Sequence, residues 1–372
     1  MKIVCHREGF LAACQLASVA VAARDVKPVL RNIKAIVDDD RCTLMATDLE
    51  LGIRLEVRGI KVEEPGNALL PTTRLIAILR EATDEEMTIE AGPEKCVVRG
   101  NTNEFEMPGE DPSAFPDVPA FAEEKFHELP AGVLREMIKR TIFAAATEGQ
   151  VRFGATTGVL WELEEEKAAL IATDGRRLAL TTAQARPHGD HTTKGQLPVV
   201  PSKAMNLLAH NLTEPDETIR ISLRANEVLM KTERAMIYSR LVEGRFPNYK
   251  QVVPQKHTHR VPFTVGPFLA AVRQAAIMTD DESKRVRFQF AKKKLTLRAQ
   301  GVESGQSRVE LPIEYDGKGL EISFDPKFVT DLLRVLEPDT PLVLDMNDSA
   351  SPAVFRHEPN YLYVIVPLVE TK

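Results

Sequence analysis

The side chains of this sequence that could do chemistry are carboxylates and histidines in three short stretches. Asp48 and Glu50 lie in LMATDLELGIRL, and Asp174 lies in the similar stretch LIATDGRRLAL. His188 and His191 flank Gly-Asp in the third stretch, ARPHGDHTTKG. Carboxylates could act as general acids or bases, and two histidines with an aspartate could bind a metal. One hypothesis is therefore a metal-dependent enzyme that uses Asp48, Asp174 and the HGDH loop.

The competing interpretation is that these residues are structural. An aspartate in a turn accepts hydrogen bonds from its own backbone, and Asp-Gly between two apolar runs is a strong hairpin signal. A catalytic acid also has no need to recur at the same place in a second copy. We therefore interpret Asp48 and Asp174 as turn residues and the HGDH stretch as a solvated loop. No GxxxxGK[ST], GxGxxG or GxSxG motif occurs, so nucleotide-binding loops and serine hydrolase sites lack their usual signals.

The similarity of the two Thr-Asp stretches belongs to a longer repeat. A more divergent third copy fits the rest of the chain, because EISFDPKFVTDLLRVL from residue 321 repeats its strand, break and helix pattern. Such periodicity predicts duplicated domains, which we place at 1–124, 125–256 and 257–372. Three markers recur in one order at offsets of 126 to 131 residues: Thr47-Asp48 as Thr173-Asp174, Pro71 as Pro201, and AFPDV as RFPNYKQV.

Each copy predicts the same elements, which are a helix, several strands, a second helix and further strands. Segments such as RVRFQFAKKKLTLRA alternate polar with apolar residues, a pattern typical of antiparallel strands with one solvent-exposed face. The helices are too few to cover both faces of a parallel sheet. The predicted fold class is α+β, with three similar domains of two helices packed on antiparallel sheets. The joints are expected in AFAEEKFHELP and VPQKHTHRVPF.

Composition indicates a soluble globular protein. The 372 residues are 43% hydrophobic and 27% charged, and no apolar run is long enough for a transmembrane helix or a signal peptide. The four cysteines, Cys5, Cys14, Cys42 and Cys96, show no CxxC spacing, so we expect reduced, mostly buried thiols in a cytoplasmic protein. A net charge of −6 argues against a surface that is basic throughout.

Cations nevertheless recur on the predicted helices. In the helix that opens the second copy, Leu134, Met137 and Ile138 share one face, while Arg135 and Lys139 lie on the other. If the copies surround a centre with their helices inward, such cations would line it and contact phosphates without reading bases. A solvated helix face is the simpler alternative for any single residue. The other helix-borne cations are Arg74, Arg80, Lys203, Arg273, Lys327 and Arg334.

The chain resembles the bacterial DNA sliding clamps, the beta subunits of DNA polymerase III. The resemblance runs from MKIVCHREGFLAACQLASVAVAARDVKPVL through TDLEL, ATDGRRLA and LVEGRFPNYKQVVP to YVIVPL. It implies the DNA clamp fold and a head-to-tail homodimer that closes a ring around duplex DNA. It also implies a processivity factor without catalytic residues, cofactor or metal. Its partners would be the replicative polymerase catalytic subunit, the clamp loader and repair proteins, which bind through short linear peptides.

The resemblance further implies three sets of site residues. Arg24 and Gln150 match loop positions that contact duplex DNA, in addition to the helix cations. An edge strand with Phe105 and Met107 would meet Ile277 and Met278 of the second subunit at the dimer interface. A hydrophobic cleft between the second and third domains would receive the peptides, and its residues would be Thr173, Gly175, Arg176, Arg177, Leu178, Pro247, Val252, Val364, Ile365, Val366, Pro367 and Leu368.

Overall fold

The structure is a computed structural model that describes residues 1–22, 27–147, 149, 155–280, 284–301, 304–357 and 359–369. The chain separates into two compact units. Unit 1 holds the whole first predicted repeat and part of the second, and unit 2 holds the rest of the second repeat and the third. Unit 1 comprises Met1–Leu134, Ala185–Thr192 and Lys203–Leu241, and unit 2 comprises Arg135–Gln184, Thr193–Ser202 and Val242–Lys372.

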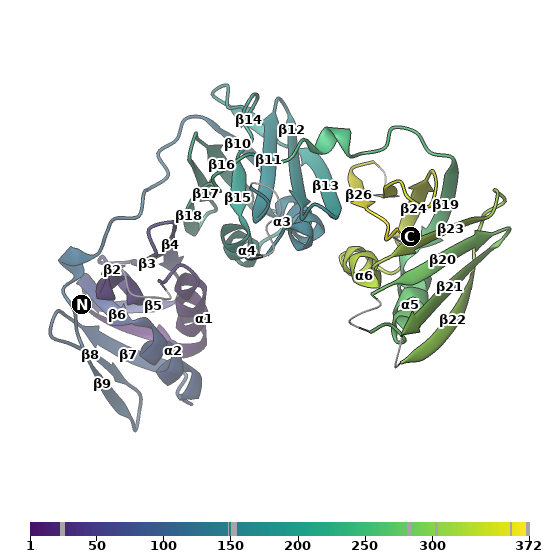
Figure 1. Ribbon diagram of the computed structural model, residues 1–372. Helices are drawn as coiled ribbons and strands as arrows, with labels where there is room; N and C mark the ends of the chain where they lie inside the picture. Colours follow the sequence, from purple (N-terminus) through teal and green to yellow (C-terminus); the bar gives the residue numbers. More distant parts are fainter. Residues whose placement is uncertain are drawn as a thin grey trace. The chain divides into compact units, whose positions relative to one another are not determined.

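The described residues form six α-helices, two in each predicted repeat (Figure 1), so the predicted helix content is confirmed. Within unit 1, α1 packs against α2, and within unit 2, α5 packs against α6. The helices are α1 (Arg7–Ser18), α2 (Thr72–Glu81), α3 (Ala131–Thr141), α4 (Ser202–Asn211), α5 (Val265–Ala276) and α6 (Pro326–Arg334).

The Asp-Pro break predicted in the third repeat is the start of α6. The Asp325 carboxylate accepts a hydrogen bond from the Lys327 backbone N–H at 2.9 Å, and Pro326 occupies the first helical position. Both features suit a helix start, where backbone N–H groups have no partner within the helix. The helix then buries an apolar stripe that includes Val329 and Leu332.

Antiparallel sheets make up the rest of unit 1. The described part contains a five-stranded sheet, β5-β1-β7-β8-β9, and a nine-stranded sheet, β14-β10-β16-β17-β18-β4-β3-β2-β6. In the larger sheet β18 pairs with β4, which joins strands of the first and second repeats. The strands are β1 (Lys2–His6), β2 (Asn32–Val37), β3 (Cys42–Thr47), β4 (Leu51–Val57), β5 (Ile60–Glu64), β6 (Gly66–Pro71), β7 (Glu86–Ala91), β8 (Lys95–Arg99), β9 (Glu104–Pro108), β10 (Phe126–Pro130), β14 (Arg186–His188), β16 (Thr218–Leu223), β17 (Glu227–Lys231) and β18 (Ala235–Arg240).

Unit 2 repeats this plan. Its described residues form an eight-stranded sheet, β15-β11-β12-β13-β26-β25-β24-β19, and a four-stranded sheet, β22-β21-β20-β23. Here β13 pairs with β26, with Leu178 opposite Val364, and this pairing joins the second repeat to the third. The strands are β11 (Gly158–Glu164), β12 (Lys167–Thr173), β13 (Arg177–Gln184), β15 (Val199–Pro201), β19 (His259–Thr264), β20 (Val286–Ala291), β21 (Lys294–Gly301), β22 (Gly305–Pro312), β23 (Leu320–Phe324), β24 (Pro341–Met346), β25 (Ala353–His357) and β26 (Tyr361–Ile365).

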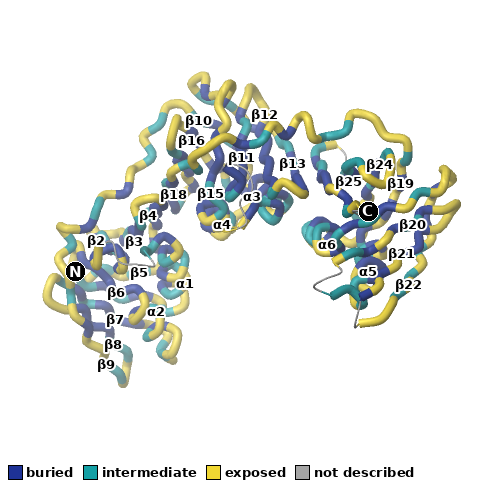
Figure 2. The backbone as a smooth tube through the Cα atoms, in the orientation of Figure 1, coloured by how far each residue is buried: buried dark blue, intermediate teal, exposed yellow. Residues whose placement is uncertain are grey.

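Apolar clusters hold the joined sheets together, and Figure 2 shows buried residues along the helices and strands and exposed residues in most connections. In unit 1, Phe115 and Val118 pack with Leu229 and Met236 of the second repeat. In unit 2, Phe246 packs in a cluster that combines second-repeat residues with Val354 and Val364 of the third. The Phe-Pro markers of the first and second repeats therefore each pack at the junction with the next repeat.

Two segments predicted as linkers are partly strands. The stretch AFAEEKFHELP contains β10, which pairs with β14 and β16, and VPQKHTHRVPF contains the start of β19, which pairs with β24. Their charged residues and prolines suggested linkers. The strands that they pair with lie far away in the sequence, so the local pattern did not reveal the pairing. The domain boundaries at 124/125 and 256/257 stay predictions.

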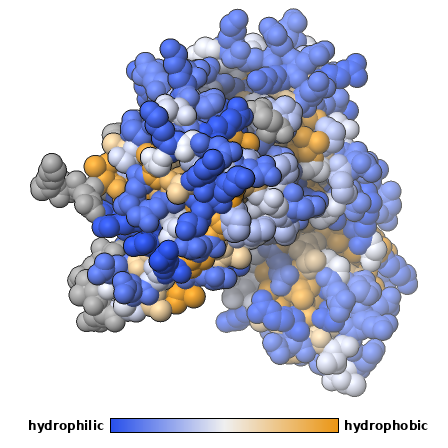
Figure 3. Space-filling model, turned by 90° about the vertical axis from the view of Figure 1, so that its right-hand side faces the viewer, coloured by the Kyte–Doolittle hydropathy of each residue, from blue (hydrophilic) through white to orange (hydrophobic). Residues whose placement is uncertain are grey.

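The cysteines are buried free thiols, as predicted. Burial raises the pKa of Cys5 and of Cys42 to about 12, so these thiols stay protonated at neutral pH. The face shown in Figure 3 is mainly hydrophilic, with small apolar patches among the charged side chains. Among the described residues, none of the helices has the length and apolar character needed to cross a membrane.

Candidate functional site

The two Thr-Asp stretches form the same turn. In each, the threonine hydroxyl donates to a backbone carbonyl four residues on, at 2.9 Å from Thr47 and 2.6 Å from Thr173. Each aspartate carboxylate accepts hydrogen bonds from the backbone N–H groups two and three residues later, at 3.1 and 2.7 Å for Asp48 and 2.9 and 3.1 Å for Asp174. The interpretation of both aspartates as turn residues is confirmed.

The surroundings of the two turns differ. The position with positive φ is Leu49 (78°) in the first turn and Gly175 (86°) in the second. Glycine adopts this conformation without steric cost, and it also leaves room beside the second turn. The free oxygen of Asp48 binds Lys203 Nζ at 2.6 Å, whereas Asp174 accepts from Arg177 Nε at 2.9 Å.

Arg177 is the most heavily engaged side chain at this second turn. Its side chain is only 8% exposed, and its three nitrogens donate to Asp174, to Asp331 Oδ2 at 2.7 Å and to the Phe143 carbonyl at 2.7 Å. The guanidinium carbon also lies 4.6 Å from the centroid of the Phe328 ring. Because Asp331 and Phe328 belong to α6, Arg177 ties the start of β13 to the third repeat.

An apolar cavity of about 210 Å³ lies beside this turn within unit 2. Three segments distant in sequence line it: the turn and the start of β13, the segment around 247–252, and the end of β26. Val252 and Val366 remain 41% and 38% exposed, so apolar surface is open to solvent there. The structure brings together nine of the twelve predicted cleft residues: Thr173, Gly175, Arg176, Arg177, Leu178, Pro247, Val252, Val364 and Val366.

The other three predicted cleft residues do not line this cavity. Ile365 points into the core and is fully buried, because alternate side chains of β26 face opposite sides of the sheet. Pro367 is buried, and the Leu368 backbone N–H donates to the Ser323 carbonyl at 2.8 Å. The tail after Val366 therefore follows β23 at that point.

Sequence reasoning missed Tyr249 as a cavity residue. It begins a short 3-10 helix (Tyr249–Gln251), is 7% exposed, and donates its hydroxyl to Glu162 Oε2 at 2.9 Å. Burial and this carboxylate raise the pKa of Tyr249, so the phenol stays neutral. The sequence signal that could have indicated it was its place in RFPNYKQV, the second copy of the Phe-Pro marker.

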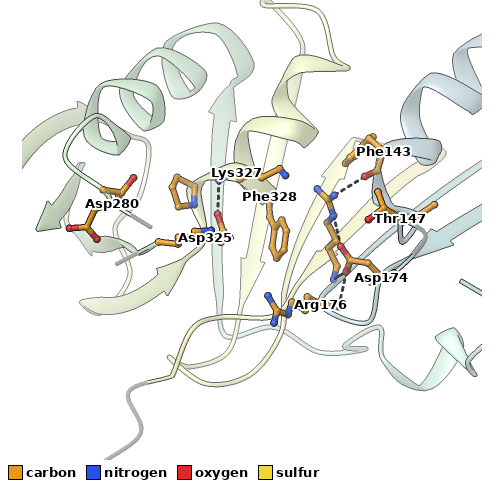
Figure 4. A pocket seen from close by; sticks show the side chains of 14 residues that line it. Phe143, Thr147, Asp174, Arg176, Asp280, Asp325, Lys327 and Phe328 are labelled. Carbon is orange, nitrogen blue, oxygen red and sulfur yellow. Dashed lines mark hydrogen bonds and ion pairs between the residues drawn. The ribbon is translucent and has the colours of Figure 1, made fainter. Parts of the chain in front are cut away.

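A second and larger cavity, of about 910 Å³, adjoins the turn from the α6 side and is polar (Figure 4). Arg176 and Arg177 line both cavities. In Figure 4 the Arg176 side chain extends toward the space below the Phe328 ring. The lining also includes Phe143, Thr147, Asp280, Asp325 and Lys327.

The geometry gives the metal-enzyme hypothesis no support. Asp48 and Asp174 are occupied by their own turns and by cations, and the described residues contain no group of three or more potential metal-binding side chains. The HGDH stretch is also not a solvated loop throughout, which corrects our prediction. His191 is 7% exposed and faces buried His127, with 2.7 Å between their Nδ1 atoms, while His188 binds Glu128 at 2.8 Å.

The predicted DNA-contacting cations of the helices are exposed, while the apolar residues beside them are buried. In α3, for example, Leu134 and Met137 are buried, and Arg135 and Lys139 are exposed. Lys139 lies within ion-pair distance of Glu136 and Glu337. Arg24 and Gln150 lie outside the described residues. The remaining exposed cations are Arg74 and Arg80 on α2, Lys203 on α4 and Arg273 on α5.

The predicted dimer residues lie at open edges and helix ends. Phe105 is 39% exposed on β9, an edge strand of its sheet, whereas Met107 on the same strand is 4% exposed and packs inward. Ile277, which caps the C-terminus of α5, is 69% exposed, the most exposed large apolar residue in the described part of the chain. Met278 beside it is partly buried.

Comparison with known proteins covers nearly the whole chain. Sequence models of the N-terminal, central and C-terminal domains of the DNA polymerase III beta subunit match residues 1–119, 128–248 and 250–368. The chain is 28% identical to the beta sliding clamp of Pseudomonas putida and 26% identical to that of Escherichia coli. Both alignments span 371 residues, which is 99% of this chain and 100% of the relative.

Solved structures agree with these matches. A Pseudomonas aeruginosa sliding clamp bound to griselimycin aligns with a TM-score of 0.90 and 27% identity. The DNA polymerase III beta subunit of Thermotoga maritima aligns with a TM-score of 0.87 and 25% identity. Each comparison covers 100% of both chains, and the predicted three-domain α+β clamp fold is confirmed. The chain therefore belongs to the DNA polymerase III beta subunit family, the beta sliding clamps.

Proposed function

We propose that this chain is a DNA sliding clamp, a processivity factor that encircles duplex DNA as a homodimeric ring and tethers its partners. The observation that carries the tethering role is the apolar cavity where β13 meets β26. A small apolar cavity with a few polar groups at its rim suits a short peptide anchored by leucine or phenylalanine. The proposed domains are 1–124, 125–256 and 257–372.

The proposed partners at this cavity are the replicative polymerase catalytic subunit, the clamp loader and repair proteins, each through a short linear peptide. The proposed site comprises the nine predicted residues that line the cavity, with Tyr249 added. Tyr249 supports the site because its hydroxyl is held by Glu162, so its ring is a fixed wall. Such a protein acts in the cytoplasm and is a non-catalytic subunit of the polymerase holoenzyme.

The proposed DNA contacts are weak and independent of sequence. Exposed cations on α2, α3, α4 and α5 support them, since Lys and Arg attract phosphates electrostatically. A net charge of −6 for the whole chain disfavours tight binding. A closed ring needs no tight contact, because topology retains it on DNA while it slides. We include Arg24 and Gln150 among the proposed DNA-contacting residues.

The proposed dimer joins the β9 edge of one subunit to the third repeat of the other. Open strand edges with apolar side chains favour pairing with another chain, and β9 with Phe105 is such an edge. In unit 2, β22 is also an edge strand, and exposed Ile277 lies at the end of the helix that packs against it. Two identical heterologous contacts would close a two-fold ring.

Retention on DNA tests the proposal. The protein is loaded onto nicked circular plasmid by a clamp loader, and gel filtration then separates bound from free protein. Half of the sample is linearised with a restriction enzyme at unchanged salt. We expect retention on the circle and loss from the linear form, because a ring leaves over an end. Equal retention on both forms would refute encirclement.

A further inference from the structure

We infer that unit 1 contains a separate ligand site, a cavity between α1 and α2 that binds a small phosphorylated molecule of nucleotide size. The cavity has a volume of about 830 Å³, which is within the range of small-molecule sites. It shares no lining residue with the apolar cavity of unit 2, so the inference does not depend on the proposed peptide binding.

The hydroxyl of Thr72 has no partner within the protein. Thr72 lines the cavity and is 4% exposed, and among the described residues its Oγ1 has no hydrogen-bond partner. Ser202, which follows the proline marker of the second repeat as Thr72 follows that of the first, donates its hydroxyl to the Thr157 carbonyl at 2.8 Å. A buried hydroxyl without a partner is unfavourable, and a ligand that accepts its hydrogen bond removes that penalty.

The charged side chains that line the cavity are cations. Arg31 contributes from the segment before β2 and Arg80 from the last turn of α2, and no carboxylate occurs among the described residues of the lining. Arg80 is exposed, and no described residue forms a hydrogen bond or an ion pair with its side chain. Guanidinium groups without a neighbouring carboxylate attract an anion, and their planar forks of donors match the oxygens of a phosphate.

The start of α2 adds to this preference for an anion. No side chain caps the helix, because the residue before it is Pro71, whereas Asp325 caps α6. Uncapped backbone N–H groups and the helix dipole favour negative charge at this end of a helix. Because Thr72 is the first residue of α2, its hydroxyl and these N–H groups lie together.

Apolar side chains line another part of the wall. Val21 and Ala22 follow α1, and Ile76 and Ala77 belong to α2. They can pack against an apolar or aromatic group that is attached to the phosphate, and a nucleotide has this combination. Duplex DNA would meet only the exposed rim, because the 4% exposure of Thr72 places its hydroxyl below the surface.

Calorimetric titration of the full-length protein with ADP, adenosine and inorganic phosphate tests the site. We expect ADP to bind, phosphate to bind at least about tenfold more weakly because the base contacts are lost, and adenosine not to bind. Thr72→Val and Arg80→Gln should each weaken ADP binding about tenfold, the loss of a hydrogen bond to a charged group. Arg41→Gln removes the same charge from an exposed position outside the cavity and should bind ADP normally.

Stability without ligand distinguishes a binding role of Thr72 from a structural one. Thr72→Val should keep or raise the thermal midpoint of unfolding, because it removes a buried hydroxyl that has no partner. A lowered midpoint, absence of ADP binding, equal affinity for ADP and adenosine, or normal ADP binding by Thr72→Val would overturn the inference. An equal loss of affinity for a duplex oligonucleotide in Thr72→Val would also overturn it, because the cavity would then be a contact for the DNA backbone.

Discussion

Arg176 and Arg177 are neighbours in the sequence and have opposite environments. The guanidinium of Arg177 is enclosed by Asp174, Asp331 and two aromatic rings, while that of Arg176 is open to solvent. An arginine buried among carboxylates contributes to stability mainly because its loss would leave them unpaired. The same residue type thus ties two elements together at one position and stays exposed at the next.

Replacing Arg177 should destabilise unit 2. We expect Arg177→Met to lower the free energy of unfolding by about 3 kcal/mol, because Asp174 and Asp331 would be left largely buried without their cation. Arg176→Met is the matched control and should change stability by less than about 0.5 kcal/mol. Urea unfolding followed by circular dichroism measures both, and equal effects would contradict the assigned roles.

The His127–His191 contact should make stability depend on pH. His191 Nε2 lies 3.1 Å from the Leu223 backbone nitrogen and 3.3 Å from the Leu223 carbonyl oxygen, and His191 Nδ1 lies 2.7 Å from His127 Nδ1. Burial, and then the neighbouring His127, lower the pKa of His191. The unfolded state therefore binds a proton more readily, so the stabilisation is complete above about pH 6.5 and falls as the pH drops toward the folded-state pKa.

Unfolding at two pH values checks this dependence. Between pH 7 and pH 5 the free energy of unfolding of the wild-type protein should fall by up to about 2 kcal/mol more than that of His191→Gln. This is the largest difference that the uptake of one proton on unfolding can produce over that interval. Identical pH profiles for the two proteins would show that His191 does not contribute.

At the scale of elements, the residues at the end of β26 form one wall of the cavity. A single substitution there can alter the cavity without disturbing the core. Val366 lines the cavity and is 38% exposed, whereas Val369 is 59% exposed and does not line it. Val366→Asp should weaken binding of a Leu-Phe peptide about tenfold, the loss of roughly one buried apolar contact. Val369→Asp should bind normally, and calorimetric titration of both variants provides the comparison.

Much of this element structure could be predicted from the sequence, because local patterns specify it. The helix starts, the Thr-Asp turns and the alternation of the strands depend on residues close in sequence. The strand character of β10 could not be predicted in the same way, because its partners β14 and β16 lie far along the chain. The pairing of Arg177 with Asp331 spans 154 positions, so the sequence suggested a cleft residue but not its burial.

The resemblance located the cleft segments, and the structure refined their membership. Ile365 does not line the cavity because of strand alternation, whereas Tyr249, at the start of a short 3-10 helix, lines it together with Pro247 and Val252. Neither distinction can be drawn from residue type, since valine, isoleucine and tyrosine are common in cores as well as in clefts.

At the scale of the whole molecule, a substitution of the exposed Ile277 tests the proposed dimer with little effect on the folding of the single subunit. Ile277→Asp should leave the thermal midpoint of unfolding nearly unchanged, because 69% of the residue is already in solvent. It should shift the protein from dimer to monomer in light scattering and abolish retention on circular plasmid, because a charge would be buried at the proposed interface. A dimer of unchanged strength would misplace that interface.

The pairing of β13 with β26 has a consequence for synthesis of the chain. One wall of the cavity is translated with β13, and the opposite wall emerges only with β26, much later in the sequence. While the ribosome still holds that final strand, the nascent protein has no pocket for a client to occupy. The proposed recruitment of partners would thereby be reserved for chains in which β26 has left the ribosome, and products that terminate before β26 could not compete for them.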